Sequence, residues 1–301
     1  MALSFIKAVE PVPFYKAGKS LVEIIKENMA GREPARSHAT MHASDLTKPY
    51  FCPREVALML TTNTVKKSSY IPVALRVTFD AGEMTSDLVR TKWLGQYAVG
   101  NWQCAKCGTV KTMTTNPGKV SCKAGNKHSL LCLWGYKEVR FEHAHYKVSG
   151  GIDVLVNDGT GKLLVVEIKT MSATEFDKLL APLAEHRLRT NLYMNLIENS
   201  MNPWRTGIDT KQARVLYISR GHGKKDLSGE ITPFKEFLVD RDDSVLQNLF
   251  VRAEQIMVYK KEGLIPNGIC DTSFSPAAKQ CSCTKACFSG HFPHQQPAFP
   301  L

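Results

Sequence analysis

Two apolar runs in the middle of the chain, at residues 150–156 and 163–170, are separated by a short polar stretch. Each run alternates in polarity or is almost continuously β-branched, and residues 157–161 between them contain two glycines. Short apolar runs joined by a glycine-containing loop are typical of a β-hairpin. We therefore expect two neighbouring antiparallel strands here.

Elsewhere the pattern alternates between helical and extended periodicity. Apolar residues recur at helical spacing in several segments, and Pro182 interrupts one of them because proline cannot continue a helix. We expect helices at residues 53–60, 82–94, 173–197 and 244–261, and strands at residues 136–141, 213–219 and 231–239. Helices, a hairpin, another helix and a returning strand in this order predict an α/β fold with a mixed sheet flanked by helices.

Three polar residues interrupt the apolar hairpin: Asp153 in its first run, and Glu167 and Lys169 in its second. Because successive side chains along a strand point to opposite faces, Glu167 and Lys169 share a face while Ile168 points into the core. Two carboxylates on neighbouring strands form a hard oxygen site for Mg²⁺ or Mn²⁺. Such an ion stabilises charge on a phosphate, and a nearby lysine can orient or activate the attacking water. The hairpin therefore predicts the catalytic site of a metal-dependent phosphodiesterase.

Composition narrows the class of partner. The chain of 301 residues carries 39 Lys and Arg against 28 Asp and Glu, a net charge of +11, which favours a polyanionic partner such as DNA or RNA. The sequence has no apolar run of about 18 residues and no signal-peptide pattern at its start. We therefore expect a soluble, cytoplasmic protein without a membrane partner.

Nine cysteines, an odd number, fall into two groups. In a chain without export features, clustered cysteines are more often metal ligands than disulfides. The first group begins with Cys104 and Cys107, which form a Cys-x-x-Cys-Gly knuckle, and continues with Cys122 and then either Cys132 or His128. This spacing predicts a tetrahedral structural Zn²⁺ site, with Cys132 favoured as the fourth ligand. A small polar insertion of this kind needs such a site in order to fold.

The second group joins the two ends of the chain. Its members are Cys52, Cys270, Cys281, Cys283 and Cys287. Four thiolates suit either Zn²⁺ or a [4Fe-4S] cluster, and spacing alone does not decide between them.

A family resemblance is carried by Cys52-Pro53-Arg54, Gly151-Ile152-Asp153, Glu167-Ile168-Lys169 and the C-terminal cysteines. Over roughly residues 45–290, this set resembles the PD-(D/E)xK nuclease superfamily. Within it, the chain is similar to the RecB-like iron-sulfur branch that includes the AddB nuclease domain and the CRISPR-associated exonucleases. The zinc-knuckle insertion also resembles that of bacteriophage-encoded relatives, which would place the protein in the host cytoplasm.

The resemblance implies a restriction-endonuclease-like fold and specific residue roles. Asp153 and Glu167 would bind Mg²⁺ or Mn²⁺ with the Ile168 carbonyl, and Lys169 would act on the water. The resemblance also implies that an iron-sulfur clasp joins the N- and C-terminal segments. Its ligands would be Cys52, Cys270, Cys281 and Cys287, with Cys283 a bystander or substitute.

Two positions depart from the family pattern. Related nucleases often carry Gly-x-x-x-His before the core, whereas here Ser86 follows Gly82 at that spacing. They also often carry Gln-x-x-x-Tyr after the core strands, where this chain has Arg189 and Tyr193. Arg189 can contact phosphate, and Tyr193 can stack on a base or pack in the core. We predict these two as DNA-binding residues.

The chain is expected to divide into four segments. Residues 1–100 form a helical region with the first cluster cysteine, 101–134 the zinc-binding insertion, 135–262 the nuclease core, and 263–301 the iron-sulfur tail. The predicted function is a Mg²⁺- or Mn²⁺-dependent deoxyribonuclease, an exonuclease on single-stranded DNA that works in replication, recombination or repair, with a helicase or recombination protein as partner. The alternative is a catalytically weak or inactive DNA-binding scaffold with a nuclease fold.

Overall fold

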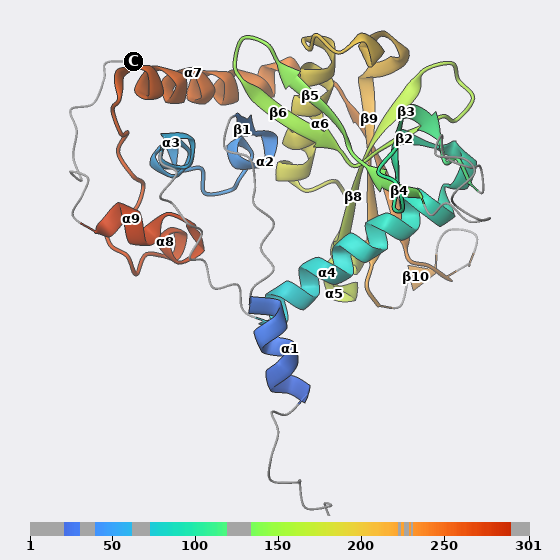
Figure 1. Cartoon of the computed structure of the whole chain (residues 1–301), viewed down its shortest axis with the longest axis horizontal. Coiled ribbons are helices and arrows are strands. Elements are labelled where there is room, and N and C mark those ends of the chain that lie inside the picture. The colour runs from blue at the N-terminus through green and yellow to red at the C-terminus, as the bar shows by residue number, and fades with distance from the viewer. Residues whose placement is uncertain are drawn as a thin grey trace, which may run out of the picture.

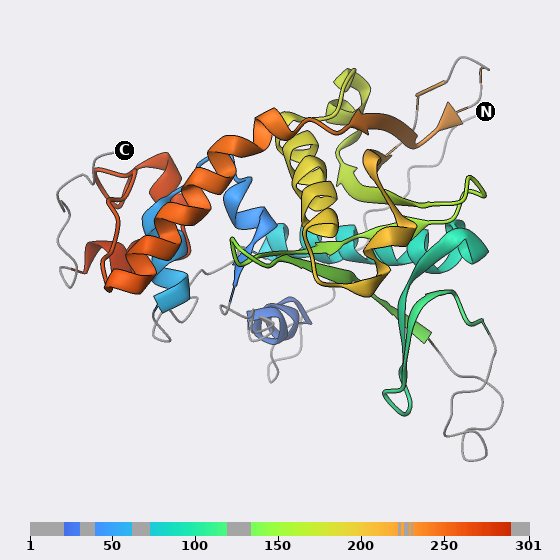
Figure 2. The same ribbon diagram turned by 90° about the horizontal axis from the view of Figure 1, so that it is seen from above.

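The computed structural model describes residues 21–30, 40–61, 73–118, 134–221, 224–225, 229 and 231–289. It is a mixed α/β protein in which helices flank a large mixed sheet (Figures 1 and 2). None of the helices within these ranges is long and apolar enough to cross a membrane.

The large sheet, as far as the structure describes it, has seven strands. They are β2 (Ala98–Cys104), β3 (Val110–Thr115), β4 (Trp134–Lys137), β7 (Val154–Val156), β8 (Leu163–Met171), β9 (Ile208–Ser219) and β12 (Phe234–Asp240). Their order is β12-β9-β8-β7-β2-β3, and β4 pairs with the other edge of β2. β8 and β9 are parallel, whereas β7 and β8 are antiparallel, so the predicted hairpin is confirmed.

A second, smaller sheet consists of β1 (Met41–His42), β6 (Val148–Ile152) and β5 (Val139–His143) in the order β1-β6-β5. At two places a single residue joins a strand of one sheet directly to a strand of the other. Glu138 joins β4 to β5, and Asp153 joins β6 to β7. The first predicted hairpin strand is therefore two strands in different sheets, because the chain bends at Asp153.

Two helices connect the parallel strands β8 and β9. Ser172 caps α5 (Ala173–Lys178) by accepting a hydrogen bond from the Glu175 N–H, and α6 (Ala184–Glu198) follows. The gap between them contains Pro182, so the predicted break is confirmed. α6 lies against strands of both sheets, so its buried residues form part of the main core.

Elements from both ends of the described chain lie together on the side away from β3, except for α1 (Leu21–Ala30), which contacts α4 (Val73–Leu88) (Figure 1). The N-terminal elements of this group are α2 (Ala43–Leu46) and α3 (Pro53–Thr61), and the C-terminal ones are α7 (Gln247–Glu262), α8 (Pro276–Gln280) and α9 (Thr284–Phe288). α3 packs against α7, and α8 and α9 lie below them at the left of Figure 1. Segments more than 200 residues apart in sequence thus lie side by side.

The long helix α4 (Val73–Leu88) continues directly into a π-helical turn, η1 (Val89–Trp93). The helix begins at Val73, nine residues before the predicted start at residue 82. The hydrophobic pattern misses its first half because no buried face forms there. Gly82 brings α4 close to β8, where an added Cβ would lie 3.3 Å from the Thr170 hydroxyl. The remaining elements of the described residues are short: η2 (Gly95–Tyr97), η3 (Pro203–Gly207), β10 (Lys224–Lys225), β11 (Ile231–Thr232) and η4 (Asp243–Leu246).

Candidate active site and cysteine pocket

Asp153 lies at the bend between the two sheets. Its Oδ2 accepts a hydrogen bond of 2.8 Å from the main-chain N–H of Ile168 on β8. This bond holds the side chain against the strand that carries Glu167 and Lys169. The position of the Asp153 carboxylate therefore depends on the junction between the sheets as well as on the hairpin.

Glu167 and Lys169 point to the same face of β8, as strand alternation predicts. The Lys169 Nζ lies 2.5 Å from Oε1 of Glu167 and 3.8 Å from Oδ2 of Asp153. It also donates a 3.2 Å hydrogen bond to the Ile168 carbonyl. The structure thus brings together the three residues that the sequence singled out.

Glu167 is completely buried, and its second oxygen, Oε2, has no hydrogen-bond partner among the described residues. A buried unpaired carboxylate oxygen is costly unless a cation or donor satisfies it. No group of three or more His, Cys, Asp or Glu side chains within the described ranges is arranged to hold a metal ion. Mg²⁺, however, commonly binds one or two carboxylates and keeps several waters. The carboxylate oxygens of Asp153 and Glu167 fit that requirement.

The electrostatics of the site follow from burial. Burial, and then the Glu167 carboxylate, raise the pKa of Asp153 to about 6. Burial alone would lower the pKa of Lys169, but the carboxylates of Glu167 and Asp153 outweigh it and the pKa is raised. Two acids packed this closely repel each other, so the site favours an added positive charge.

Arg189 and Tyr193 extend from α6 toward this centre. The Arg189 Nη1 lies 3.3 Å from Oε1 of Glu167, and its Nε donates a 3.5 Å hydrogen bond to the Thr47 hydroxyl. The ring of Tyr193 is 7% exposed and packs where Gly150 leaves room, since a Cβ there would lie 2.7 Å from the ring. Arg189 therefore binds the Glu167 carboxylate, and Tyr193 packs as a core aromatic rather than as an open stacking platform.

Glu138 and Arg90 also border Asp153. The Arg90 Nε donates a 2.8 Å hydrogen bond to the Asp153 carbonyl. Its Nη2 lies 3.7 Å from Oδ1 of Asp153 and 3.5 Å from Oε1 of Glu138. Burial, and then the charge of Asp153, raise the pKa of Glu138. No motif in the sequence marks either residue, because the sheet junctions and a π-helical turn bring them together.

Ser86 follows Gly82 by four residues on α4, at the position where the resemblance described above would place a histidine. Glu83 and Asp87 beside it bind the other end of the Arg90 guanidinium, at 3.7 and 3.3 Å from Nη1. They therefore contact Arg90 on the side away from Asp153. Neither one joins the Asp153 and Glu167 pair directly.

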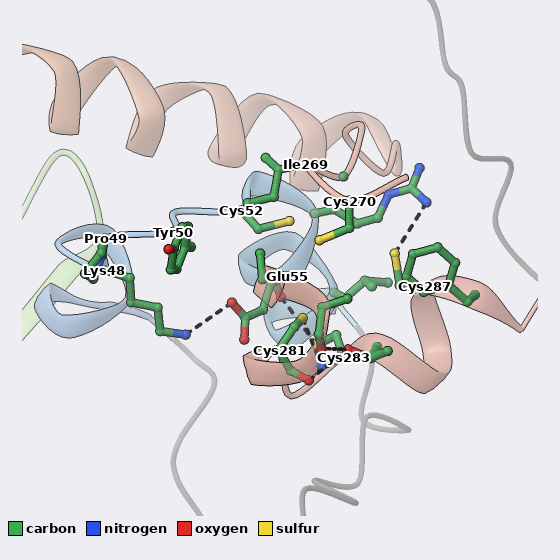
Figure 3. Close-up of a pocket in the computed structure, with 17 residues that line it drawn as sticks. Lys48, Pro49, Tyr50, Cys52, Glu55, Ile269, Cys270, Cys281, Cys283 and Cys287 are labelled. Carbon is green, nitrogen blue, oxygen red and sulfur yellow. Dashed lines mark hydrogen bonds and ion pairs between the residues drawn. The ribbon is translucent and has the colours of Figure 1, made fainter. Parts of the chain in front are cut away.

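A second cluster lies at the junction of the two chain ends. All five cysteines of the second group, Cys52, Cys270, Cys281, Cys283 and Cys287, line one cavity of about 270 Å³. Figure 3 shows the sulfurs of Cys52 and Cys270 pointing into the same space, between α3 and the C-terminal segment. The structure therefore brings together thiols that the sequence separates by more than 200 residues.

Two charged residues of α3 hold the C-terminal segment beside these thiols. Arg54, which is 1% exposed, donates a 2.7 Å hydrogen bond to the Pro266 carbonyl and a 3.8 Å contact to the Cys287 sulfur (Figure 3). Glu55 accepts hydrogen bonds from the N–H and hydroxyl of Ser282 at 3.2 and 3.0 Å. Lys48 in turn lies 3.2 Å from the Glu55 carboxylate. The clasp is thus built from polar contacts as well as cysteines.

Cys283 differs from the other thiols of the cavity. It is 1% exposed, belongs to the main apolar core, and its sulfur lies 3.7 Å from the Glu55 carbonyl oxygen. Its main-chain N–H donates to the Cys281 sulfur at 3.4 Å. A hydrogen bond from the Cys283 thiol lowers the pKa of Cys281, and the same bond raises the pKa of Cys283. Because the thiolate is the metal-binding form, Cys281 is the better ligand of the two.

The predicted zinc knuckle lies only partly within the described residues. The Cys104 carbonyl accepts a 2.9 Å hydrogen bond from the Gly108 N–H, and Gly108 has φ +72°, so the knuckle is a tight turn that favours glycine. Cys104 is buried, and the Cys107 sulfur lies 3.1 Å from the Thr109 hydroxyl. Cys122, His128 and Cys132 lie outside the described residues, so zinc binding stays a prediction.

Comparison with known proteins gives distant structural likenesses. No family model and no curated protein sequence matches the chain. The crystal structure of SSO0001 aligns with a TM-score of 0.43 and 16% identity, over 89% of this chain and 96% of the other. An alkaline exonuclease from Laribacter hongkongensis, LHK-Exo, aligns with a TM-score of 0.30 and 16% identity, over 42% of this chain and 57% of its own. LHK-Exo in complex with dAMP aligns with a TM-score of 0.36 and 11% identity, over 75% and 89%. At these scores the likenesses carry no conclusion about function.

Proposed function

We propose that this protein is a metal-dependent nuclease whose catalytic residues are Asp153, Glu167 and Lys169. The observation that carries the proposal is the buried Glu167 oxygen without a partner, beside Asp153 and within reach of Lys169. Asp153 and Glu167, with the Ile168 carbonyl, would hold Mg²⁺ or Mn²⁺. When bound, such an ion stabilises charge on the phosphate and lowers the pKa of a coordinated water.

The protein residues would supply position and charge. The Ile168 N–H fixes the Asp153 carboxylate, so one of its oxygens stays committed to the strand while the other faces Arg90. Lys169 carries its ammonium between the two acids, where it would orient the attacking water toward phosphorus. Arg189, bound to Glu167 and about one-fifth exposed, would contact the phosphate once the substrate is bound.

Single-stranded DNA, attacked from an end, is the proposed substrate. The net charge of +11 supports a polyanion through sequence-independent phosphate contacts. A role in replication, recombination or repair, and a helicase or recombination partner, rest on the family resemblance alone. Tyr193 is left out of the binding surface because its ring is buried.

We also propose that Cys52, Cys270, Cys281 and Cys287 hold a [4Fe-4S] cluster, with Cys283 a bystander. Each thiolate of such a cluster binds a different iron, so its ligand sulfurs lie farther apart than those around one ion. The meeting of five thiols around one cavity supports a metal centre there, and the choice of a cluster over Zn²⁺ rests on the family resemblance. A structural Zn²⁺ at Cys104, Cys107, Cys122 and Cys132 remains part of the proposal.

The test of the nuclease proposal is cleavage of end-labelled single-stranded DNA by anaerobically prepared protein with Mg²⁺ or Mn²⁺. Lys169→Met should lower the cleavage rate about 10²- to 10⁴-fold, the usual effect of losing a group that transfers a proton. Asp153→Asn should abolish cleavage in the presence of either cation. Lys162→Met, in the exposed loop of the same hairpin, is the matched control and should cleave as the wild type does. Cleavage that survives Lys169→Met, or none by the wild type, would refute the proposal.

One observation favours the alternative of an inactive DNA-binding scaffold. Both Lys169 and Arg189 contact the same Glu167 oxygen, so protein cations already neutralise part of this carboxylate. A scaffold would bind single-stranded DNA equally well in the wild type and in Glu167→Gln, with no cleavage in either. A nuclease would instead lose cleavage in Glu167→Gln.

A further inference from the structure

Arg90 is the most fully engaged charged residue near the proposed catalytic site, and the proposed chemistry does not use it. It is 3% exposed and its guanidinium lies over the Tyr136 ring, 5.3 Å from the centroid. Burying an arginine is costly unless its donors are paired. We therefore infer the role of Arg90 from the partners of its guanidinium.

The contacts of Arg90 divide by nitrogen atom. Nη1 faces Glu83 and Asp87 of α4, whose side chains are more than half exposed. Nη2 faces the carboxylates of Glu138 and Asp153, and Nε donates to the Asp153 carbonyl. One guanidinium thus binds Asp153 through both its main chain and its side chain.

The two inner partners, Glu138 and Asp153, are each the single residue that joins a strand of one sheet directly to a strand of the other. Val139 and Ile152, next to them, are paired across β5 and β6, so the two junctions lie beside each other. Gly151 makes this arrangement possible, since a Cβ there would lie 2.2 Å from a Glu138 carboxylate oxygen. Arg90 therefore contacts both junction residues, next to the point where the Asp153 side chain is oriented toward β8.

The π-helical turn η1 explains how Arg90 reaches this place. The turn follows α4 directly, and its wider spacing shifts the register of side chains relative to a continuous α-helix. Single π-helical turns occur frequently at functional sites. Val89 and Arg90 are the buried residues of the turn, so it directs the arginine inward rather than to solvent.

We infer that Arg90 is a positioning residue for the metal site: its guanidinium fixes the two sheet junctions and so sets the Asp153 carboxylate relative to Glu167. The inference rests on the proposed function, because the carboxylate pair is the proposed cation site. Arg90 touches neither the substrate nor the ion in this account. It acts only through Asp153 and Glu138.

A purely electrostatic role and a positioning role of Arg90 predict opposite changes in cation affinity when its charge is removed. The inference can therefore be tested. Removing a positive charge next to two acids should strengthen cation binding if electrostatics alone matter. If Arg90 positions Asp153, the same removal should weaken binding. Outer partners of metal ligands typically change metal affinity by about 10- to 100-fold.

The experiment is a calorimetric titration of the full chain with Mn²⁺, normalised to the folded fraction from thermal unfolding. Arg90→Gln is expected to weaken Mn²⁺ binding about 10- to 100-fold, and Arg90→Lys, which keeps the charge but not the fork of donors, about 10-fold. Arg214→Lys is the matched control, because Arg214 forms an exposed pair with Glu236 in the sheet that carries Glu167. It should bind Mn²⁺ as the wild type does.

The outcomes separate this inference from the proposed function. If the wild type binds no Mn²⁺, the proposed function fails and the inference falls with it. If the wild type binds Mn²⁺ and Arg90→Gln binds it equally or more tightly, only the positioning role is overturned. Failure of both Arg90 variants to fold would assign Arg90 to the fold alone and would also overturn the inference.

Discussion

The carboxylate centre and the cysteine pocket draw on the chain in different ways. Asp153, Glu167 and Lys169 come from one hairpin and its preceding bend, and strand pairing holds them together. The cysteine pocket joins Cys52 to thiols at residues 270–287, and side-chain contacts such as Arg54 to Pro266 hold it together. Local pairing fixes the first site as the sheet forms, whereas the second requires the two chain ends to meet.

One short segment contacts both regions. The Thr47 hydroxyl accepts a hydrogen bond from Arg189, which also binds Glu167 in the carboxylate centre. The next residue, Lys48, binds Glu55, which holds Ser282 beside the cysteines. Disturbing the cysteine pocket should therefore also reach the carboxylate centre through residues 47–55.

The largest expected effect comes from replacing one proposed cluster ligand. Cys287→Ser should lose the iron and the broad visible absorbance of the anaerobically prepared protein, and solubility and cleavage should fall together. Cys283→Ser changes a thiol of the same cavity whose sulfur lies 3.7 Å from the Glu55 carbonyl oxygen, and it should keep the iron. Iron analysis and visible spectra of both variants measure this. Equal iron in both, or loss from Cys283→Ser alone, would contradict the ligand assignment.

A smaller effect is expected from the polar part of the clasp. Arg54→Met removes the donor to the Pro266 carbonyl and should lower the free energy of unfolding by about 1.5–3 kcal/mol. Arg252→Met is the matched control: its guanidinium lies 4.7 Å from the Phe51 ring centroid, a contact worth about 0.5–1 kcal/mol at exposed sites. Urea unfolding compares the two. Equal destabilisation would show that Arg54 does not hold the chain ends together.

The smallest effect is a pH dependence on the carboxylate side. The His186 Nδ1 lies 2.7 Å from the Tyr217 hydroxyl, and burial, then Lys169 and Arg189, lower the pKa of His186 to about 3. Since the unfolded pKa is about 6.5, the stabilisation is complete above that pH and is lost as the pH falls toward 3. Between pH 7 and pH 6 the loss should be about 0.7 kcal/mol.

His186→Asn isolates this contribution, because asparagine does not titrate. The difference in unfolding free energy between the wild type and this variant, measured at several pH values, should shrink as the pH falls below about 6.5. A difference that stays constant from pH 7 to pH 5 would mean that His186 does not stay neutral in the fold.

The sequence predicts the elements of this protein better than their connections. The hairpin, the break near Pro182 and the grouping of Glu167 with Lys169 follow from local periodicity, which depends only on neighbouring residues. The extent of α4 does not, because its first half exposes apolar residues such as Val77 and Phe79 and so lacks the expected stripe. Local pattern also misses the bend at Asp153, which moves the chain from one sheet to the other.

The site residues that the sequence misses are those whose role depends on long-range contact. Glu138 and Arg90 carry no motif, and a π-helical turn and two sheet junctions bring them to Asp153. Arg189 was assigned to phosphate on spacing, and the structure places it on Glu167. The same turn, Val89–Trp93, also carries the exposed Lys92, so the local sequence does not distinguish the buried cation from the solvated one.

The most direct test of the central claim is a crystal structure of the protein soaked with Mn²⁺, with the ion located by its anomalous scattering. The account predicts a Mn²⁺ ion bound between Asp153 and Oε2 of Glu167, the oxygen that has no partner in the described structure. An ordered site in which Lys169 and Arg189 remain on Glu167 and Mn²⁺ is absent, or Mn²⁺ bound elsewhere, would contradict it.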